Sequence, residues 1–492
     1  MKPRFFLLIL CVGLSFCLCA CSSSPKSAVV TSKNDGSFDA SIVVTDEEPE
    51  KNREEIKYNY SEQFYSLDGS VSFQFKLESA LQNSKMPVIE VCPHNFTPED
   101  AQYISNLLFG DTQLFESDPS DMLTKEEIRN CITLWTKYLS TDALVELYGV
   151  DNDLFISQMK SEIQRYLEKY TIALDTAPGN NEKTPCQWTF FPISHYWKYV
   201  KNQSPLEDKT SRIEATAEIN GYSYLYSVSS RDEKDYKINS LYVYFDEVDS
   251  PYNINQKIMT LTLCKSSTPT EEQLRDIEEK TQKMLNSMNI GEWYVDECYF
   301  EALGYGKESA YVVHAKAVPV FNGIKVVRQK QLDNLKSNES YASNYYYTDA
   351  EFSFSPDGVL IDCSITSPVD VVQVLNDNVQ TLSFEELIQK AKANLELRDY
   401  FEYANNVIYG NEKYNCTVNI TEMEYGLTRV KVPNTSESYY YVPAITLRGD
   451  YQAYDKEGNI CFDSNTFWGK EPQTLLVLNA VDGSVINVSN GY

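Results

Sequence analysis

Two stretches of sequence with the same pattern decide the predicted fold: Phe354-Ser355-Pro356-Asp357-Gly358-Val359-Leu360-Ile361 and Leu478-Asn479-Ala480-Val481-Asp482-Gly483-Ser484-Val485-Ile486. Each places Asp-Gly between two apolar runs. Asp-Gly favours a tight turn because both residues tolerate positive φ. Each stretch therefore predicts a β-hairpin.

A capped helix precedes each hairpin. Thr268-Pro269-Thr270-Glu271 leads into apolar residues at helical spacing, and so does the capping box Ser383-Phe384-Glu385-Glu386. Several strand-like segments follow each helix, over 293–303, 311–318 and 347–365 in the first unit and over 414–420, 428–432, 439–447 and 475–488 in the second. A helix followed by an antiparallel meander, twice over, indicates two modules in which the helix covers one sheet face.

The part of the chain before these units has a mixed pattern. Val71 to Leu77 alternates like a strand after an Asp68-Gly69 turn, and Thr97-Pro98 is typical of a helix start. Helices are also predicted over 124–148 and 151–172, and strands on both sides of Asn220-Gly221. The predicted fold class is α+β, with an N-terminal mixed α/β-containing domain over 61–265 and helix-plus-antiparallel-sheet modules over 266–370 and 371–492.

The C-terminal units carry a resemblance. Their helix-then-strands order, the closing Leu478–Ile486 and the segment Val318-Pro319-Val320-Phe321-Asn322-Gly323-Ile324 resemble PepSY-type and YycH/YycI-type extracytoplasmic modules, over about residues 270–492. The whole chain, including Met86-Pro87-Val88 and Leu108-Phe109-Gly110-Asp111, is similar to uncharacterised lipoproteins of gut clostridia. The resemblance implies a surface location and a role in restraining a protease or modulating a membrane sensor. It supplies no catalytic residue.

The N-terminus has the pattern of an export signal. Lys2 and Arg4 precede an apolar run of 16 residues, which is shorter than the roughly 20 residues that span a bilayer. The run ends in Leu18-Cys19-Ala20-Cys21, which resembles a bacterial lipobox. Residues 1–20 are therefore predicted to be a signal peptide, and Cys21 the lipidated N-terminus; the alternative is an ordinary signal peptide with a chance cysteine. We expect a lipid-anchored protein on the extracytoplasmic face of the cell membrane.

The chain is strongly acidic. Its 492 residues include 43 Lys+Arg and 71 Asp+Glu, for a net charge of -28. Removing residues 1–20 leaves 41 basic residues and a net charge of -30. This acidity argues against nucleic-acid binding, which requires a basic surface to neutralise phosphates. Residues 21–60, rich in Ser, Lys and Asp, predict a flexible acidic tether that holds the body away from anionic headgroups.

Eight cysteines remain outside the signal peptide and the lipidation site: Cys92, Cys131, Cys186, Cys264, Cys298, Cys363, Cys416 and Cys461. An even number outside the cytoplasm permits disulfides. Their scattered spacing also fits unpaired buried thiols, which we expect for most of them. No metal site is predicted, because structural zinc sites show closely spaced ligand pairs.

No catalytic constellation is convincing. Ser157-Gln158-Met159-Lys160 matches the S-x-x-K of penicillin-recognising enzymes, but no K-T-G follows, so we interpret it as a solvent-facing helical turn. Asp463-Ser464-Asn465 begins like a calcium loop, but aromatic residues follow, so we predict a surface loop. His94 and His314 are interpreted as structural. The prediction is that the chain has no catalytic, cofactor-binding or metal-binding residues.

Tyrosine is abundant, with 36 Tyr beside 22 Phe and 5 Trp, and it clusters at 345–347 and 439–441. Tyr rings suit stacking on sugars or peptides. Tyr is also a good strand residue, which is the interpretation we favour.

These observations lead to a functional hypothesis. The favoured function is a non-enzymatic, membrane-anchored binding or regulatory protein for an envelope protein or peptide. The alternative is a cell-surface glycan-binding protein or polysaccharide hydrolase, because catalytic carboxylates are paired in space and not in sequence. Solute capture for a transporter is less favoured, because the chain lacks the strand–helix alternation of two-lobed binding proteins.

Overall fold

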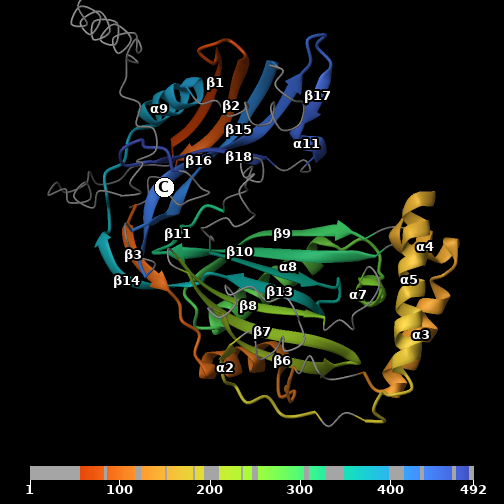
Figure 1. Ribbon diagram of the computed structural model, residues 1–492. Coiled ribbons are helices and arrows are strands. Elements are labelled where there is room, and N and C mark those ends of the chain that lie inside the picture. The colour runs from red at the N-terminus through yellow and green to blue at the C-terminus, as the bar shows by residue number, and fades with distance from the viewer. Residues whose placement is uncertain are drawn as a thin grey trace, which may run out of the picture.

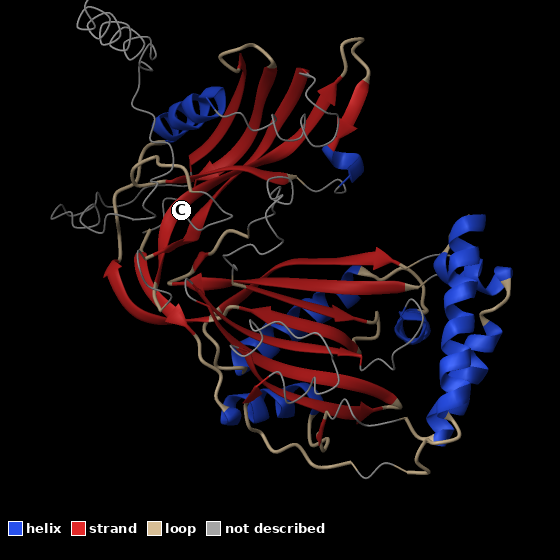
Figure 2. Ribbon diagram, viewed as in Figure 1, coloured by secondary structure: helices blue, strands red, loops and turns tan. Residues whose placement is uncertain are grey.

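The computed structural model describes residues 56–81, 86–117, 123–149, 152–180, 183–192, 210–233, 236–245, 253–303, 310–328, 348–397, 415–432, 437–467 and 472–486. The predicted signal peptide and Cys21 lie outside these residues. The strand β1 (Ile56–Tyr65) begins inside the predicted tether. In the described part of the chain, two large sheets lie one above the other, joined at one side (Figures 1 and 2).

The lower sheet in Figure 1 has ten strands, all paired antiparallel. In spatial order they are β11 (Ile324–Lys325), β10 (Tyr311–Phe321), β12 (Asp349–Phe354), β13 (Leu360–Thr366), β8 (Tyr236–Phe245), β7 (Tyr222–Glu233), β6 (Thr210–Ile219) and β4 (Phe115–Glu116), with β9 (Trp293–Ala302) on β10 and β5 (Phe191–Pro192) on β6. We call this the ten-stranded sheet.

The upper sheet has eight strands, and only the β2–β15 pair is parallel. In spatial order they are β1, β2 (Val71–Leu81), β15 (Asn415–Lys431), β16 (Tyr439–Tyr454), β3 (Val88–Pro93) and β14 (Val369–Asn376), with β17 (Ile460–Asp463) and β18 (Gln473–Asn479) also on β16. β15 pairs along the whole of one edge of β16. On the other edge of β16, β3, β18 and β17 pair with successive segments. We call this the eight-stranded sheet.

Helices cover one face of each sheet. On the ten-stranded sheet, α2 (Pro98–Phe109), α7 (Ile254–Cys264) and α8 (Glu271–Ser287) share a core with alternate strand residues such as Val243, Ala315 and Phe352. On the eight-stranded sheet, α9 (Phe384–Leu397) packs over Phe73 and Val418. The helices α3 (Lys125–Lys137), α4 (Thr141–Tyr148) and α5 (Asp153–Ala173) form a separate cluster, at the right in Figure 1, and the four-residue α11 (Ser464–Phe467) follows β17.

The predicted helix starts are confirmed. The side chains of Thr97, Thr270 and Ser383 accept hydrogen bonds from backbone N–H groups three residues later, at 3.1, 3.2 and 3.3 Å. In each case the side chain of the residue three positions later accepts a hydrogen bond from the backbone N–H of the cap. These reciprocal bonds satisfy N–H groups that the helix leaves unpaired, which is why the pattern is visible in sequence.

Both predicted Asp-Gly turns form. The Ser355 N–H donates to the Val359 carbonyl at 2.8 Å, and the Asn479 N–H donates to the Ser484 carbonyl at 2.8 Å. Only the glycine of each pair has positive φ, 77° and 76°. Asn220-Gly221, by contrast, uses positive φ at both positions.

The predicted α+β class is wrong. Of the described residues, 45% lie in strands and 30% in helices, so the molecule is dominated by its two sheets. The helices α8 and α9 were each expected to cover a sheet formed by their own module, but each covers a sheet that also contains strands from outside that module. Strands β1 to β3 from the predicted N-terminal domain belong to the eight-stranded sheet, and β6 to β8 extend the ten-stranded sheet beside β13. Alternation in sequence shows which side chains a strand buries, but it does not show which distant strand pairs with it.

The two sheets meet at a tightly packed junction that combines hydrogen bonds with an apolar cluster, in which Phe321 of β10 packs against Tyr441 of β16. The chain passes between them twice, from β3 to α2 and from β13 to β14, and the His94 N–H donates to the Pro368 carbonyl at 2.8 Å where these passages meet. At a second contact between the sheets, β11 packs against β15. The Val327 N–H donates to the Leu427 carbonyl at 2.8 Å, and a Cβ on Gly426 would lie 2.7 Å from the Lys325 carbonyl oxygen. Close backbone approach at this contact therefore depends on Gly426.

Two further observations concern cysteines and the membrane. All eight cysteines from Cys92 to Cys461 have free thiols in the structure. Burial raises the pKa of Cys264 and of Cys416 to about 12, so both thiols stay protonated and pack as small apolar groups. Among the described helices, none is long and apolar enough to cross a membrane.

Candidate functional site

The S-x-x-K sequence lies on α5 and does not form a catalytic pair. Ser157 is exposed, and the Lys160 ammonium donates to the Thr141 hydroxyl at 2.7 Å. The interpretation as a solvent-facing helical turn is confirmed.

The calcium-like sequence is not a surface loop. Asp463 ends β17 and Ser464 begins α11. The Asp463 carboxylate accepts from the Asn465 N–H and from the Gln452 amide, each at 2.9 Å, while the Ser464 hydroxyl accepts from the Tyr451 N–H at 3.0 Å. These oxygens hold the strand end against β16, because a chain reversal here leaves backbone N–H groups to satisfy.

The Tyr439–Tyr441 cluster is structural. Tyr439 and Tyr441 are buried, the Tyr441 hydroxyl donates to the Thr348 hydroxyl at 3.2 Å, and the Arg429 guanidinium lies 4.5 Å from the Tyr439 ring centroid. The favoured interpretation of this cluster as strand residues is confirmed, but the expected half-exposed sheet is not found, because Tyr439 and Tyr441 are buried. Tyr345–Tyr347 lies outside the described residues.

A polar cluster lies on the ten-stranded sheet, on the face opposite the helices; we call it the His314 cluster. His314 Nδ1 lies 3.2 Å from the Ser353 hydroxyl and 3.5 Å from Glu351, and its ring stacks on Tyr299 with centroids 5.2 Å apart. Register places these residues in one row, because His314 pairs with Tyr299 on one side and with Ser353 on the other. The remaining members are Glu301, Lys316 and Asp362. The Glu301 carboxylate is 3.6 Å from His314 Nε2, and the Lys316 ammonium lies over the Tyr299 ring.

The order of the groups in the His314 cluster does not activate Ser353 as a nucleophile. The hydrogen bond from His314 lowers the pKa of Glu351, whereas burial raises the pKa of Asp362. Ser353 donates to Asp362 at 3.0 Å and so lies between the acid and His314. A nucleophilic serine requires the imidazole between serine and acid, so this order does not activate Ser353. No group of His, Cys, Asp and Glu within the described ranges is arranged to hold a metal ion.

The edge strand β14 is the second candidate surface. It is the last strand of the eight-stranded sheet: β3 pairs with one edge, and no described strand pairs with the other. Val371 and Val372 are each 52% exposed and Val374 is 46% exposed. Register shifts occur at Val372 and at Leu375, so the strand is bulged where its valines are most exposed.

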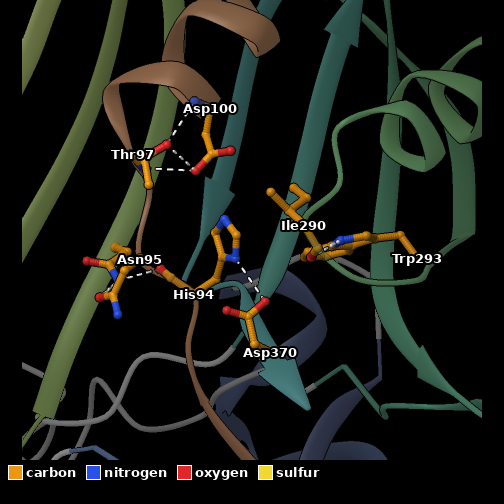
Figure 3. Close-up of polar contacts among 8 residues, drawn as sticks. His94, Asn95, Thr97, Asp100, Ile290, Trp293 and Asp370 are labelled. Carbon is orange, nitrogen blue, oxygen red and sulfur yellow. Dashed lines mark hydrogen bonds and ion pairs between the residues drawn. The ribbon is translucent and has the colours of Figure 1, made fainter. Parts of the chain in front are cut away.

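The charge around β14 is one-sided. Neither residues 86–124 nor residues 337–389 contain a Lys or Arg, so both β3 and β14 lie in stretches without strong positive charge. The Asp370 carboxylate is 51% exposed and accepts from His94 Nδ1 at 2.9 Å through one oxygen (Figure 3). Glu90 on β3 accepts from the Gln373 amide at 2.5 Å. The edge therefore presents valines flanked by carboxylates.

The strand β14 was not predicted from the sequence. The predicted module boundary between 370 and 371 falls inside this strand. The signal was present, because Val369-Asp370-Val371-Val372-Gln373-Val374 is rich in β-branched residues. The bulges explain why strict alternation did not reveal it, since each extra residue breaks the period of two.

Comparisons with known proteins supply no family for this chain. No family model matches it, and no curated protein matches it. One solved structure, described as that of an uncharacterized protein from Eubacterium rectale, is similar over 87% of this chain and 93% of its own, with 9% identity and a TM-score of 0.36.

Proposed function

We propose that this protein is a membrane-anchored, extracytoplasmic and non-enzymatic binding protein, which captures an extended segment of an envelope protein as an added strand on β14. Anchoring through Cys21 is part of the proposal and rests on the lipobox sequence. A regulatory role, restraint of a protease or modulation of a membrane sensor, fits the resemblance to PepSY-type modules. The observation that carries the proposal is the row of exposed valines on a sheet edge with which no described strand pairs.

Strand addition follows from the chemistry of an open edge. An edge strand presents unpaired N–H and C=O groups, and an extended peptide can satisfy them while its side chains pack on the strand's neighbours. Natural edges are commonly protected by Lys or Pro, and β14 contains neither. It has bulges instead, which also limit indiscriminate pairing.

Photo-crosslinking in cells that express the full chain tests this proposal. A benzoylphenylalanine at Val372 is expected to attach to one envelope polypeptide, at one extended segment identified by mass spectrometry. The same probe at Ile460 is the matched control, because Ile460 is 55% exposed on β17. A synthetic copy of the attached segment should bind the purified full chain, and the uncharged change Val374→Asn should weaken that binding about tenfold.

Two results would contradict strand capture. One is equal crosslinking from Val372 and Ile460. The other is unchanged binding of the synthetic segment by the Val374→Asn chain, since Val374 is 46% exposed and its replacement leaves the core intact.

The second candidate function is glycan binding at the His314 cluster, with polysaccharide hydrolysis as its enzymatic form. Tyr299 offers a ring beside Glu301 and Lys316, and Tyr242 and Tyr244 on β8 are 37% and 38% exposed. Aromatic faces beside carboxylates suit sugar rings.

A glycan array probed with the full chain and with its Tyr299→Ala variant tests this second function. If it is correct, Tyr299→Ala loses the array signal while Tyr103→Ala, on the exposed face of α2, retains it. Release of reducing ends by the wild-type chain, abolished by Glu301→Gln, would establish hydrolysis in place of non-enzymatic binding.

A further inference from the structure

We propose that the segment captured at β14 is basic as well as apolar, with a Lys or Arg that pairs with Asp370 and β-branched or aromatic residues that pack on the valines. This inference rests on the proposed strand addition and specifies its partner. It is carried by the placement of carboxylates around an apolar edge that has no Lys or Arg near it in sequence.

Asp370 is held in position for a cation. His94 Nδ1 contacts its Oδ1 atom at 2.9 Å, and Figure 3 shows the imidazole and the carboxylate directed toward each other. The His94 side chain is 12% exposed, and its other ring nitrogen, Nε2, is buried without a partner among the described residues. The ring is therefore fixed on the inner side of Asp370, while the carboxylate remains 51% exposed on the outer side.

Backbone contacts hold His94 itself. Its N–H donates to the Pro368 carbonyl at 2.8 Å, and its carbonyl accepts from the Asn239 amide at 2.5 Å. The ring packs edge-on against Phe96, with centroids 5.1 Å apart. A carboxylate positioned in this way loses little conformational freedom when a partner's ammonium or guanidinium binds it, which favours affinity.

The charges near β14 favour a partner segment with positive charge. Asp370, Glu90 and Asp377 lie on or beside the strand, and neither 86–124 nor 337–389 provides a compensating Lys or Arg. At a net charge of -28, the whole molecule repels acidic partners and attracts basic ones. A second copy of this chain would bring two such acidic edges together, so like-charge repulsion disfavours self-pairing.

Peptide selection tests the charge preference. A display library of random ten-residue peptides is selected on the full chain, with its Val371→Asn/Val374→Asn variant used to remove peptides that bind elsewhere. We expect the selected peptides to alternate β-branched or aromatic residues with Lys or Arg. One selected peptide, its copy with Glu in place of Lys or Arg, and its copy with alternate N-methylated amides are then measured by fluorescence anisotropy.

The expected affinities separate the two proposals. The Glu copy should bind about tenfold more weakly than the selected peptide at low salt, and the difference should shrink as salt rises. Asp370→Asn should remove most of this difference but leave binding of an uncharged Thr/Val peptide within about twofold. The N-methylated copy should not bind, because it cannot donate to the open edge.

Each contrary result has one meaning. Selected peptides that depend on the valines but carry no basic residues would overturn the charge preference and leave strand addition standing. Failure to select any peptide that depends on the valines would overturn both proposals. Concentration-dependent dimerisation of the full chain that Val371→Asn/Val374→Asn abolishes would assign the edge to a second copy and would also overturn both.

Discussion

Replacement of Gly449 by Ala is expected to lower the free energy of unfolding by about 3 kcal/mol or more. Gly449 lies in β16 opposite Ile420, beside the register shift in β15. A Cβ at this position would overlap the backbone carbonyl oxygen of Asn419, and its next neighbour would be backbone as well. Both strands are central in the eight-stranded sheet, so the clash cannot be relieved by rotation of a side chain.

Urea denaturation followed by circular dichroism measures this effect, with Gly179→Ala as the control. At Gly179, no atom lies within 4 Å of the place that a Cβ would occupy, and the φ of this residue is not positive. The control should therefore unfold at the wild-type midpoint. An intermediate loss is expected for Gly426→Ala, because its Cβ would lie 2.7 Å from the Lys325 carbonyl oxygen and 2.7 Å from a Val327 methyl group, a less severe overlap than at Gly449. A Gly449→Ala midpoint equal to that of Gly179→Ala would contradict the close approach of β15 and β16.

The second large effect is expected for Arg328→Met. The Arg328 side chain is 10% exposed and lies between two carboxylates: one guanidinium nitrogen is 2.8 Å from Asp296, and another contacts Asp349. Burial raises the pKa of Asp349, and the charge of Arg328 opposes that rise. Without the guanidinium, two carboxylates remain close together, with Asp296 19% exposed and Asp349 42% exposed. Breaking a fully buried ion pair costs about 3–5 kcal/mol; because the Asp349 side chain is 42% exposed and water screens part of the repulsion, the expected loss here is about 2 kcal/mol.

The loss in Arg328→Met should depend on pH in a defined direction. Removing Arg328 raises the folded-state pKa of Asp349 further above its unfolded value. A carboxyl with a raised folded-state pKa destabilises the fold while it is ionised, and this cost disappears as the pH falls through the folded-state pKa. The variant should therefore recover part of its lost stability as the pH falls from 7 toward the raised pKa of Asp349.

Two further variants control the Arg328 experiment. Arg165→Met removes an exposed partner of Glu162 on α5 and should leave the urea midpoint unchanged. Asp296→Asn/Asp349→Asn combined with Arg328→Met should recover part of the loss, because no buried charge is then unpaired. Equal stability of Arg328→Met and Arg165→Met, or a loss that does not change with pH, would exclude the proposed role of the buried ion pair.

Local elements could be predicted from this sequence, and long-range pairings could not. The caps at Thr97, Thr270 and Ser383 satisfy N–H groups three residues away, so a window of four residues contains all the necessary information. The β2–β15 pairing joins Val71 to Cys416, and no local pattern marks such a partner. Prediction therefore succeeded for the capped helix starts and the Asp-Gly turns. It did not find α7 or the break between α3 and α4, and it failed where two separate predicted units contribute strands to one sheet.

In the candidate surfaces, too, local features could be predicted from the sequence and long-range neighbours could not. His314 and Asp362 are 48 residues apart in sequence, and the order β10, β12, β13 in the sheet brings them near the same Ser353 hydroxyl. Sequence-based reasoning interpreted His314 by itself and had no means of finding its partners. At β14, the residue types were visible in the sequence, but its position at an edge unpaired by any described strand was not, because an edge is defined only by the strands that lie beside it.

The sequence by itself determined the helix caps, the turns, the alternation of most strands and the strong negative charge. These properties are set by bonds within a few residues or by composition. Only the tertiary structure decided that the N-terminal strands complete a sheet with the C-terminal ones, that β14 is left at its edge, and that the acidic stretches around residues 90 and 370 lie together. These properties depend on which distant strands share hydrogen bonds, and that choice is made by the packing of whole sheet faces and not by the local pattern of any one strand.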